Sequence, residues 1–451
     1  MKRIFIFISL FSLILFSPVE NKKIFAAKAA QDIPSSNINN TDSSVLNVPP
    51  VSGEAQTLQR CYQLALQQSE KIAIQAQLIK EAEAHFQQSL GGILPHATFE
   101  YSNQRQNGGN GSNFTLSEIP EHRFIFSQPL FSGFKDFAAM AANRAERRQR
   151  IQETIRAKQL LFTDVADAFY LFLGYQEEME SLVTTQNALT ERIEELKKRE
   201  ALGRSRLSEV VSAEVVLNRN DAEIELVRSQ MEVSRELLEF LTGQSIEKVE
   251  DSTDEESLKA AFLTDEENYL KKSKSRPDVL ASKEALTSAQ KKITVARSGW
   301  WPSAGLDGNY YTKRVGNAGD ITWDFIFKVD VPIFDGGETL GLVKEAKAVT
   351  REAELQSQET ERNAVLEIQN AYTKFQTFLK RRDALKKALD SAEKNFQLQK
   401  EDYQKSLVNN LDVLQALQDL QDVRRDFISA HYDAKRMYWN LQVAVGSILE
   451  E

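Results

Sequence analysis

The sequence predicts a mostly α-helical protein that carries two membrane β-hairpins and repeats one unit of helix, hairpin, long helix and helix. Two stretches with the same strand ending, QPLFSGF and VPIFDGG, lie 203 residues apart. A long run of apolar residues at an average spacing of 3.5 follows each of them, which is typical of coiled-coil helices. Each stretch is preceded by a segment that alternates aromatic with polar residues, as the strands of a membrane barrel do.

Composition and charge exclude several classes of protein. The 451 residues include 65 acidic and 56 basic ones, a net charge of −9, whereas nucleic-acid binding requires a basic surface. The single cysteine, Cys61, cannot form an internal disulfide, and the four histidines show no zinc-binding spacing. Neither a nucleophile elbow nor a plausible pair of catalytic acids is present. We therefore expect no enzyme, no cofactor, no metal site and no nucleic-acid partner.

The first 29 residues match a secretory signal peptide. A basic start, Met1 to Arg3, precedes the apolar run Ile4 to Phe16, which is too short to span a bilayer. An A-x-A cleavage motif follows at Ala27 to Ala29. Residues 30–55 are polar and rich in turn formers, which predicts a disordered linker. We expect an exported chain whose mature part has no transmembrane helix.

An internal duplication organises the rest of the chain. With a shift of 203 residues, Ala168 meets Ala371 and Gly243 meets Gly446, whereas Pro95 meets Pro302 with a shift of 207. The difference falls in the hairpin turns, where insertions cost little. The sequence thus predicts a first repeat at 56–243, a solvated acidic connector at 244–275, a second repeat at 276–447 and a short tail at 448–451.

The long helices are predicted by their apolar spacing. In the first repeat the pattern runs from about Phe134 to Ala201, and a second helix follows from about Leu207 to Leu241. A helix of about 65 residues is about 100 Å long at 1.5 Å per residue. An ordinary coiled-coil rod explains this pattern equally well, so the helices alone do not decide the function.

The strands favour a membrane location. Aromatic and charged residues alternate between two faces, which fits either a membrane barrel or the edge of a globular sheet. The signal peptide favours the barrel. Because four strands cannot close a barrel and an open edge in lipid leaves backbone groups unpaired, several chains must contribute strands. The residues predicted to face lipid are Trp323, Phe325, Phe327, Phe124 and Phe126.

The repeated strand ending is predicted to join a strand to a long helix. Proline has no backbone N–H, so Pro129 and Pro332 should mark the positions where strand pairing ends. Glycine accepts backbone conformations that other residues avoid, so Gly133 and Gly336 should allow the turn into the helix.

These features together resemble the TolC-like outer membrane efflux family. The residues that carry the resemblance are the two hairpins with their QPLFSGF and VPIFDGG exits, the duplicated helices, and the breaks LGRSRLSEVVSAE and SLVNNLDVLQALQ. The resemblance covers about residues 56–447. It implies a homotrimer whose strands form a 12-stranded barrel in the outer membrane, continued into the periplasm by an α-helical barrel.

The resemblance also implies a function. Such proteins are passive exit ducts for efflux or type I secretion, which join a periplasmic adaptor and an inner-membrane transporter, either an efflux pump or an ABC exporter. The other partner is outer membrane lipid. The alternative is an exported coiled-coil protein with a structural or adhesive role in the cell envelope.

The family's entrance lies at the helix breaks, where an acid six residues after a turn glycine narrows the pore. Gly203 and Glu209 fit this spacing, and so do Ser406 and Asp412, with serine in place of glycine. Acids in the first turn of a helix are also favoured there by the helix dipole, which is the alternative explanation for both. The resemblance implies a pore constriction at Asp412, Tyr403, Glu209 and Gln415, and adaptor-docking turns at Leu202, Gly203, Arg204, Ser406 and Leu407.

Two positions depart from the family pattern at the entrance. Val408 stands where the family's prototype has an arginine that bonds the neighbouring coil, and Gln415 stands where it has a second aspartate. We therefore expect different contacts to close the entrance, with Arg204 or Arg206 as candidates.

Overall fold

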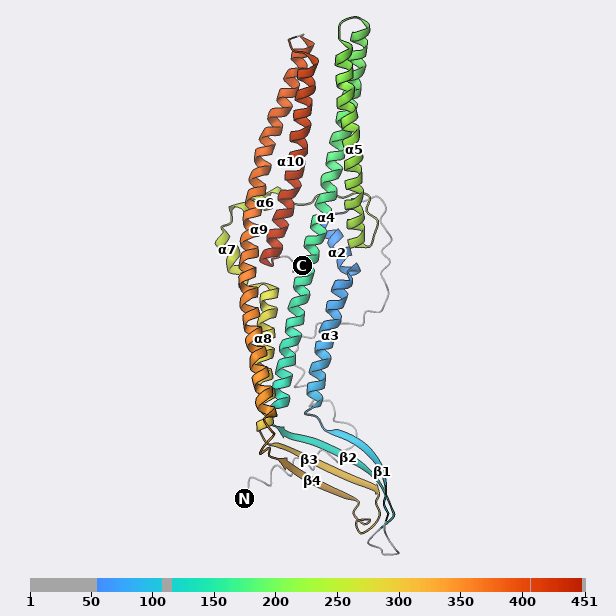
Figure 1. The fold of residues 1–451 in the computed structure, drawn as a ribbon, viewed down its shortest axis with the longest axis vertical. Coiled ribbons are helices and arrows are strands. Elements are labelled where there is room, and N and C mark those ends of the chain that lie inside the picture. Colours follow the sequence, from blue (N-terminus) through green and yellow to red (C-terminus); the bar gives the residue numbers. More distant parts are fainter. Residues whose placement is uncertain (1–54, 108–115, 406, 448–451) are drawn as a thin grey trace, which may run out of the picture. The chain divides into compact units, whose positions relative to one another are not determined.

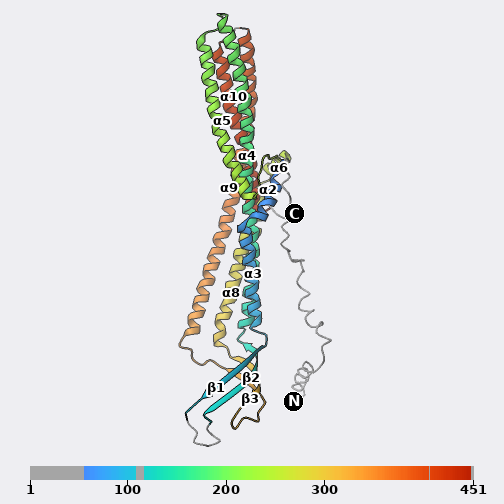
Figure 2. The same cartoon turned by 90° about the vertical axis from the view of Figure 1, so that its right-hand side faces the viewer.

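The structure, a computed structural model, describes residues 55–107, 116–405 and 407–447, which belong to one compact unit, Gly53–Glu451. The predicted signal peptide, all but the last residue of the predicted linker, Ser406 and the predicted tail lie outside the described residues. Figures 1 and 2 show that, within this unit, the strands lie at one end of the helices and the two long helical hairpins extend to the other.

The elements follow the predicted order in both repeats. The first repeat contains α2 (Leu58–Gln68), α3 (Glu70–Gly91), β1 (His96–Arg105), β2 (Glu118–Ser132), α4 (Lys135–Ala201) and α5 (Leu207–Thr242). Two short helices and a 3₁₀ helix follow: α6 (Glu255–Leu263), α7 (Glu266–Lys271) and η1 (Lys272–Ser275). The second repeat contains α8 (Pro277–Arg297), η2 (Ser298–Trp300), β3 (Ser303–Lys313), β4 (Trp323–Asp330), α9 (Glu338–Gln404) and α10 (Asn410–Val445).

The helices confirm the predicted duplicated unit. Both α4 and α9 have 67 residues, and both α5 and α10 have 36. The shorter helices end at left-handed glycines, Gly243 with φ of 69° and Gly446 with φ of 78°, a conformation that glycine adopts without a Cβ penalty. At 1.5 Å per residue, each of the 67-residue helices is about 100 Å long.

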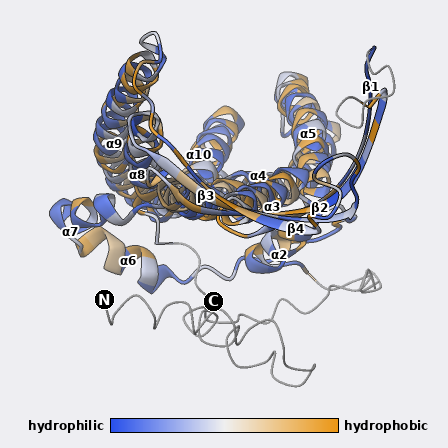
Figure 3. Cartoon of the chain, turned by 90° about the horizontal axis from the view of Figure 1, so that it is seen from below, coloured by the Kyte–Doolittle hydropathy of each residue, from blue (hydrophilic) through white to orange (hydrophobic). Residues whose placement is uncertain are grey.

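The four strands form one antiparallel sheet in the order β1-β2-β3-β4. Figure 3 shows them from below as one curved sheet. The two hairpins have the same internal register, since Phe99 lies opposite Phe124 in the first and Leu306 lies opposite Phe327 in the second. Within the described chain, β1 and β4 each have a neighbour on one side only, so both edges of the sheet are open.

Apolar clusters hold the helices together. One cluster joins α2, α4 and α5, and a second joins α6, α7, α9 and α10. A third lies near the ends of the long hairpins. Many of the predicted coiled-coil positions are buried in these clusters, among them Leu161, Val165, Ala168, Phe172, Leu189, Ile193, Leu196, Ile368 and Phe375.

The segment 244–275 differs from the solvated connector that its acidic composition predicts. Ile246 and Val249 are buried in the first apolar cluster, and Leu258 and Tyr269 are buried in the second. The prediction of a solvated connector was wrong because a few spaced apolar residues suffice to fix the segment against the helices, and two of its acids form ion pairs with helix residues, Asp251 with Lys435 and Glu255 with Arg382. The Glu255 carboxylate lies 2.9 Å from the Arg382 guanidinium of α9.

The strand-to-helix joints match the prediction at three of four positions. Gly133 and Gly336 have φ of 64° and 67°, and β4 ends at Asp330, before Pro332. In the first repeat, however, pairing continues past Pro129, because a register shift between Pro129 and Phe131 accommodates the residue without an N–H.

Candidate functional site

One face of the sheet is aromatic and exposed. Phe99 and Phe124 lie opposite each other with ring centroids 5.0 Å apart, and the rings of Trp323 and Phe325 are 5.5 Å apart. Such a surface is unfavourable in water and suited to lipid. This aromatic face consists of Phe99, Tyr101, Phe124, Phe126, Tyr310, Trp323, Phe325 and Phe327, and it includes all five residues predicted to contact lipid.

The opposite face is polar and linked across strands. Arg123 on β2 pairs with Glu100 on β1 at 3.1 Å. On the other hairpin, Asp324 accepts hydrogen bonds from the Asn309 amide at 2.7 Å and from the Tyr311 hydroxyl at 3.0 Å. Charged groups connected in this way suit a water-filled interior.

The two faces can be separated by labelling. We expect a Trp323→Cys variant, reconstituted in lipid, to resist a charged thiol reagent, while the neighbouring Asp324→Cys variant reacts, since the two side chains point to opposite faces. Both variants carry Cys61→Ala, although burial already raises the pKa of the Cys61 thiol to about 12. Equal labelling of the two positions would contradict this assignment of the faces.

At the far ends of the helices, the two hairpin turns carry exposed leucines, and the first also carries exposed arginines. Gly203 has φ of 69° and open space around it, so it is present for its backbone conformation. The predicted turn residues Leu202 and Leu407 are both exposed, and so are Leu207 and Leu411 at the starts of the following helices. Arg204 and Arg206 are exposed too.

A buried polar contact links the two hairpins just behind these turns. The Arg192 guanidinium of α4 lies 3.9 Å from the centroid of the Tyr403 ring on α9. The same guanidinium donates through Nε and Nη2 to Asn410 Oδ1 on α10, at 3.1 and 3.0 Å. Arg199 stacks on the Tyr403 ring at 5.0 Å. We call Arg192, Arg199, Tyr403 and Asn410 the tip cluster.

Of the residues predicted for the constriction, Tyr403 belongs to the tip cluster and three others lie near it. Asp412 forms a capping box with Asn409 at the start of α10, and Glu209 accepts a hydrogen bond from Ser205 at 2.7 Å. Asp412 thus serves as a first-turn cap, the alternative considered from the sequence, and both Asp412 and Gln415 keep exposed side chains. Glu209 lies in the first turn of α5, which has no side-chain cap.

Sequence reasoning missed Arg192, Arg199 and Asn410. Arginine in a charged coiled-coil helix is common, and Arg192 and Tyr403 are separated by more than two hundred residues in the chain. The only sequence signal was Tyr403 itself, an aromatic residue close to a helix break. Its partners could be found only from the way in which α4 packs beside α10.

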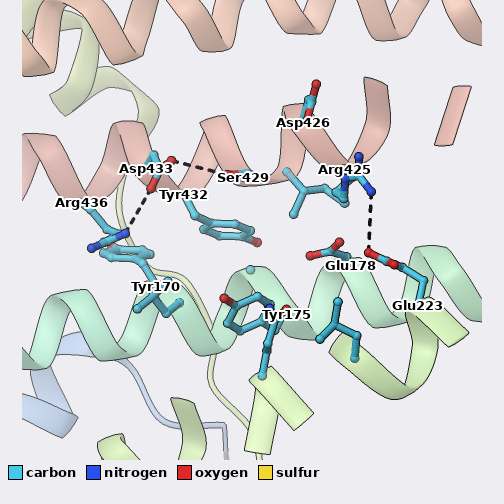
Figure 4. Close-up of a pocket in the computed structure, with 15 residues that line it drawn as sticks. Tyr170, Tyr175, Glu178, Glu223, Arg425, Asp426, Ser429, Tyr432, Asp433 and Arg436 are labelled. Carbon is cyan, nitrogen blue, oxygen red and sulfur yellow. Dashed lines mark hydrogen bonds and ion pairs between the residues drawn. The ribbon is translucent and has the colours of Figure 1, made fainter. Parts of the chain in front are cut away.

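Between the first and the third apolar clusters, α4, α5 and α10 line a polar crevice of about 400 Å³ (Figure 4). Arg425 lies 3.7 Å from Glu223, and the Tyr432 hydroxyl donates to Glu177 at 2.6 Å. Burial raises the pKa of Glu178 in the crevice wall. The α4–α10 contact is therefore polar and less tightly packed here than in the apolar clusters.

The fold and these surfaces define a class of protein, the channel subunit that places strands in a membrane and continues away from it as long helical hairpins. None of the helices in the described residues is long and apolar enough to cross a membrane. The outer membrane efflux protein family matches residues 61–244 and 271–447, so the chain belongs to this family.

Relatives and solved structures agree with this assignment. Outer membrane protein TolC of Vibrio cholerae is 24% identical over 72% of this chain and 76% of its own length. The outer membrane protein VceC of Vibrio cholerae has a TM-score of 0.72 at 20% identity, with 86% of this chain and 96% of that one covered. The CmeC channel of Campylobacter jejuni has a TM-score of 0.72 at 18% identity, with 87% and 86% covered.

The family confirms the resemblance found in the sequence. It consists of channels rather than enzymes, and it places this chain in the outer membrane, extending into the periplasm. The chain is an outer membrane efflux channel, and the alternative of a structural or adhesive coiled-coil protein is not favoured.

Proposed function

We propose that three copies of the chain assemble into a duct that carries cargo from an inner-membrane transporter, through a periplasmic adaptor, across the outer membrane. The observation that carries the proposal is a four-stranded sheet with an aromatic face, a polar face and two open edges. In lipid, each unpaired backbone group costs several kcal/mol, so the edges must be paired. Three copies of four strands would close a 12-stranded barrel.

Assembly and conduction test this proposal together. We expect native mass spectrometry of the detergent-extracted protein to show three copies, and planar bilayers containing it to show discrete conductance steps. A monomer that keeps its strand content in detergent would contradict the proposal. A chain that washes off membranes with salt alone would instead support the structural coiled-coil alternative.

At the periplasmic end, we propose that the tip cluster keeps the two helical hairpins of each chain together and the entrance narrow. Arg192 makes three contacts that join α4 to both α9 and α10. The exposed leucines beyond it form an apolar surface that suits docking of the adaptor. The predicted docking turns are those at Leu202, Gly203, Arg204, Ser406 and Leu407.

Asp412 provides a test of the entrance. Three carboxylates about 10 Å apart repel by only about 0.4 kcal/mol per pair in water, so a ring of them should not disrupt the assembly. Inside a narrow mouth the same charges favour cations. We expect Asp412→Asn to keep the capping contact with the Asn409 backbone, because the amide oxygen can still accept, and to lower cation selectivity in planar bilayers.

The control for this prediction is Asp422→Asn, which removes an exposed acid from another side of the same helix. We expect it to leave selectivity unchanged. If Asp412→Asn also retains the selectivity of the unmodified channel, Asp412 is only a helix cap and the constriction lies elsewhere.

A further inference from the structure

The polar crevice between α4, α5 and α10 has the size of a small-molecule site. Its volume of about 400 Å³ falls within the range of about 300–1,000 Å³ that is typical of ligand pockets. Leu226 and Gln230 of α5 form part of its lining and are exposed, so a ligand can enter from solvent. The wall on α4 includes Tyr170, Gly174, Tyr175 and Glu178.

One carboxylate in this crevice lacks a counter-ion in direct contact. Figure 4 shows the Glu178 side chain pointing from α4 toward α10. In the part of the chain that the structure describes, this carboxylate has no ion pair or hydrogen bond. Burial raises the pKa of Glu178, the charge of Arg425 offsets this in part, and Glu223 adds to it. A bound cation would supply the missing charge.

The two arginines that line the crevice are already engaged with other acids. Each guanidinium lies near two carboxylates, at distances of 2.9 to 3.7 Å. The contacts are those of Arg425 with Glu223 and Asp422, and of Arg436 with Asp167 and Asp433. Because acids outnumber bases around the crevice, its electrostatic potential favours a positively charged ligand.

Tyrosine rings form the rest of the wall. The rings of Tyr170 and Tyr432 are stacked, with centroids 6.3 Å apart and planes inclined by 29°. Tyr175 lines the crevice one turn before Glu178 on the same helix. The face of an aromatic ring attracts a cation that lies within about 6 Å of its centroid. A carboxylate beside such rings therefore suits an organic ammonium group.

A glycine in α4 makes room for one of these rings. Glycine in the interior of a helix is destabilising relative to alanine, so Gly174 requires a local reason. A Cβ at this position would lie 3.3 Å from Cδ2 of Tyr432, which is tighter than an ordinary contact. The missing side chain thus lets the Tyr432 ring lie against α4, next to Glu178.

The packing that the two repeats share does not account for these residues. The shift of 203 places Thr377, Arg381 and Ser229 at the positions equivalent to the glycine, the acid and the tyrosine of the crevice. None of the three keeps the chemistry of its counterpart, and the acid is replaced by a base. The combination of Gly174, Glu178 and Tyr432 belongs to this one place in the chain.

We propose that the crevice binds a small organic cation, whose ammonium group pairs with Glu178 and whose apolar part lies against the tyrosine rings. The ligand class is a primary or quaternary ammonium that carries an aromatic or alkyl group. All of the groups that would contact it belong to a single chain. The site therefore does not depend on the proposed trimer.

Three probes of similar size and different charge test the recognition. We expect isothermal titration calorimetry of the protein, extracted in a non-ionic detergent, to show saturable binding of benzylammonium. Neutral benzyl alcohol and anionic phenylacetate should bind about tenfold more weakly or not at all, because neither pairs with a carboxylate. Equal binding of benzyl alcohol, or no saturable binding of benzylammonium, would overturn the proposal.

A matched pair of variants locates the site. Glu178→Gln keeps the shape of the side chain and removes its charge, and we expect it to weaken benzylammonium binding by about tenfold or more. Glu180→Gln removes an exposed acid of the same helix that does not line the crevice, and binding should be unchanged. Equal losses in the two variants would indicate general attraction to an acidic surface and would overturn the site.

Thermal unfolding excludes misfolding as the cause of the loss. Because burial raises the pKa of Glu178, its charged form is unfavourable in the fold, and Glu178→Gln should have a Tm at least as high as that of the unmodified chain. We expect benzylammonium to raise the Tm of the unmodified chain and of Glu180→Gln, but not that of Glu178→Gln. A similar rise in Glu178→Gln would place the binding elsewhere.

The aromatic contribution is measured at Tyr175. Tyr175→Leu removes the ring and should weaken benzylammonium binding by about threefold, whereas Tyr175→Phe keeps the ring and should bind as the unmodified chain does. If the leucine and phenylalanine variants bind benzylammonium equally well, the contact between the ligand and this ring is wrong.

Discussion

Replacing Arg276 with methionine is expected to lower the stability of the channel by about 3 kcal/mol, the low end for breaking a buried ion pair. Arg276 is 1% exposed, and its guanidinium donates to the carbonyl of Ala444 at 3.0 Å and to Glu367 at 2.7 Å. It also pairs with Asp278. Without the Arg276 guanidinium, the carboxylates of Glu367 and Asp278 are left with Arg156, which lies 3.8 Å from Asp278.

The loss should depend on pH. Burial raises the pKa of Asp278, but hydrogen bonding and charge from Arg276 outweigh it and hold that pKa below its usual value. An acid whose pKa is lower in the folded state than in the unfolded state stabilises the fold at pH values above its unfolded-state pKa of about 4. This contribution is lost as the pH falls through the folded-state pKa. The difference between Arg276→Met and the unmodified chain should therefore be largest at neutral pH and narrow below about pH 4.

Thermal unfolding of the detergent-extracted protein, followed by circular dichroism, measures both effects. Arg351→Met is the matched control, because Arg351 is exposed and, among the described residues, its ion pair is with Glu354 on its own helix, at 2.6 Å. Such a pair contributes about 0.5 kcal/mol or less. Equal shifts for the two variants would show that the buried pair is not a major source of stability.

Replacing Arg192 with alanine is expected to raise the single-channel conductance by releasing the tip cluster. The substitution removes a cation–π contact and two hydrogen bonds from a charged donor, together about 3 kcal/mol. That energy corresponds to about a hundredfold shift in the ratio of closed to open entrances. Planar bilayers report the change directly, as a larger or more frequently open conductance.

Arg199→Ala is the control for the predicted effect of Arg192→Ala on conductance. Both arginines pair with Glu195 on their own helix, so the difference between them lies in the contacts with other helices. Arg199 lies farther from the Tyr403 ring, at 5.0 Å, and its loss should have a smaller effect. Native mass spectrometry should show intact trimers for both variants. Unchanged conductance in an intact Arg192→Ala trimer would mean that the tip cluster does not close the entrance.

Much of the fold follows from the local spacing of apolar residues, which can be read directly from the sequence. The 3.5-residue spacing predicts the bounds of α4 to within a residue, and the period-2 alternation from Trp323 onward predicts the aromatic face. Because of the duplication, each helix or strand predicted in one repeat can be compared with its equivalent in the other repeat. For these features, the residues that decide the structure are neighbours in the chain.

The remaining features depend on residues far apart in the sequence. Ile246 and Val249 stand among acids and give no sign that a core lies beside them. The tip cluster likewise joins Arg192 to Tyr403 and Asn410, a combination that no local pattern contains. The position of pairing beyond Pro129 depends on a register shift, which follows from the partner strand β3 rather than from β2 alone.

The lengths of α4 and α9, which are equal, and of α5 and α10, which are also equal, set the distance that the chain extends into the periplasm. Removing seven residues from α4 alone would shorten one hairpin by about 10 Å and separate Arg192 from Tyr403 and Asn410. A shorter or longer reach therefore requires matched changes in all four helices. Gradual evolution of the reach should proceed through paired insertions or deletions of whole heptads.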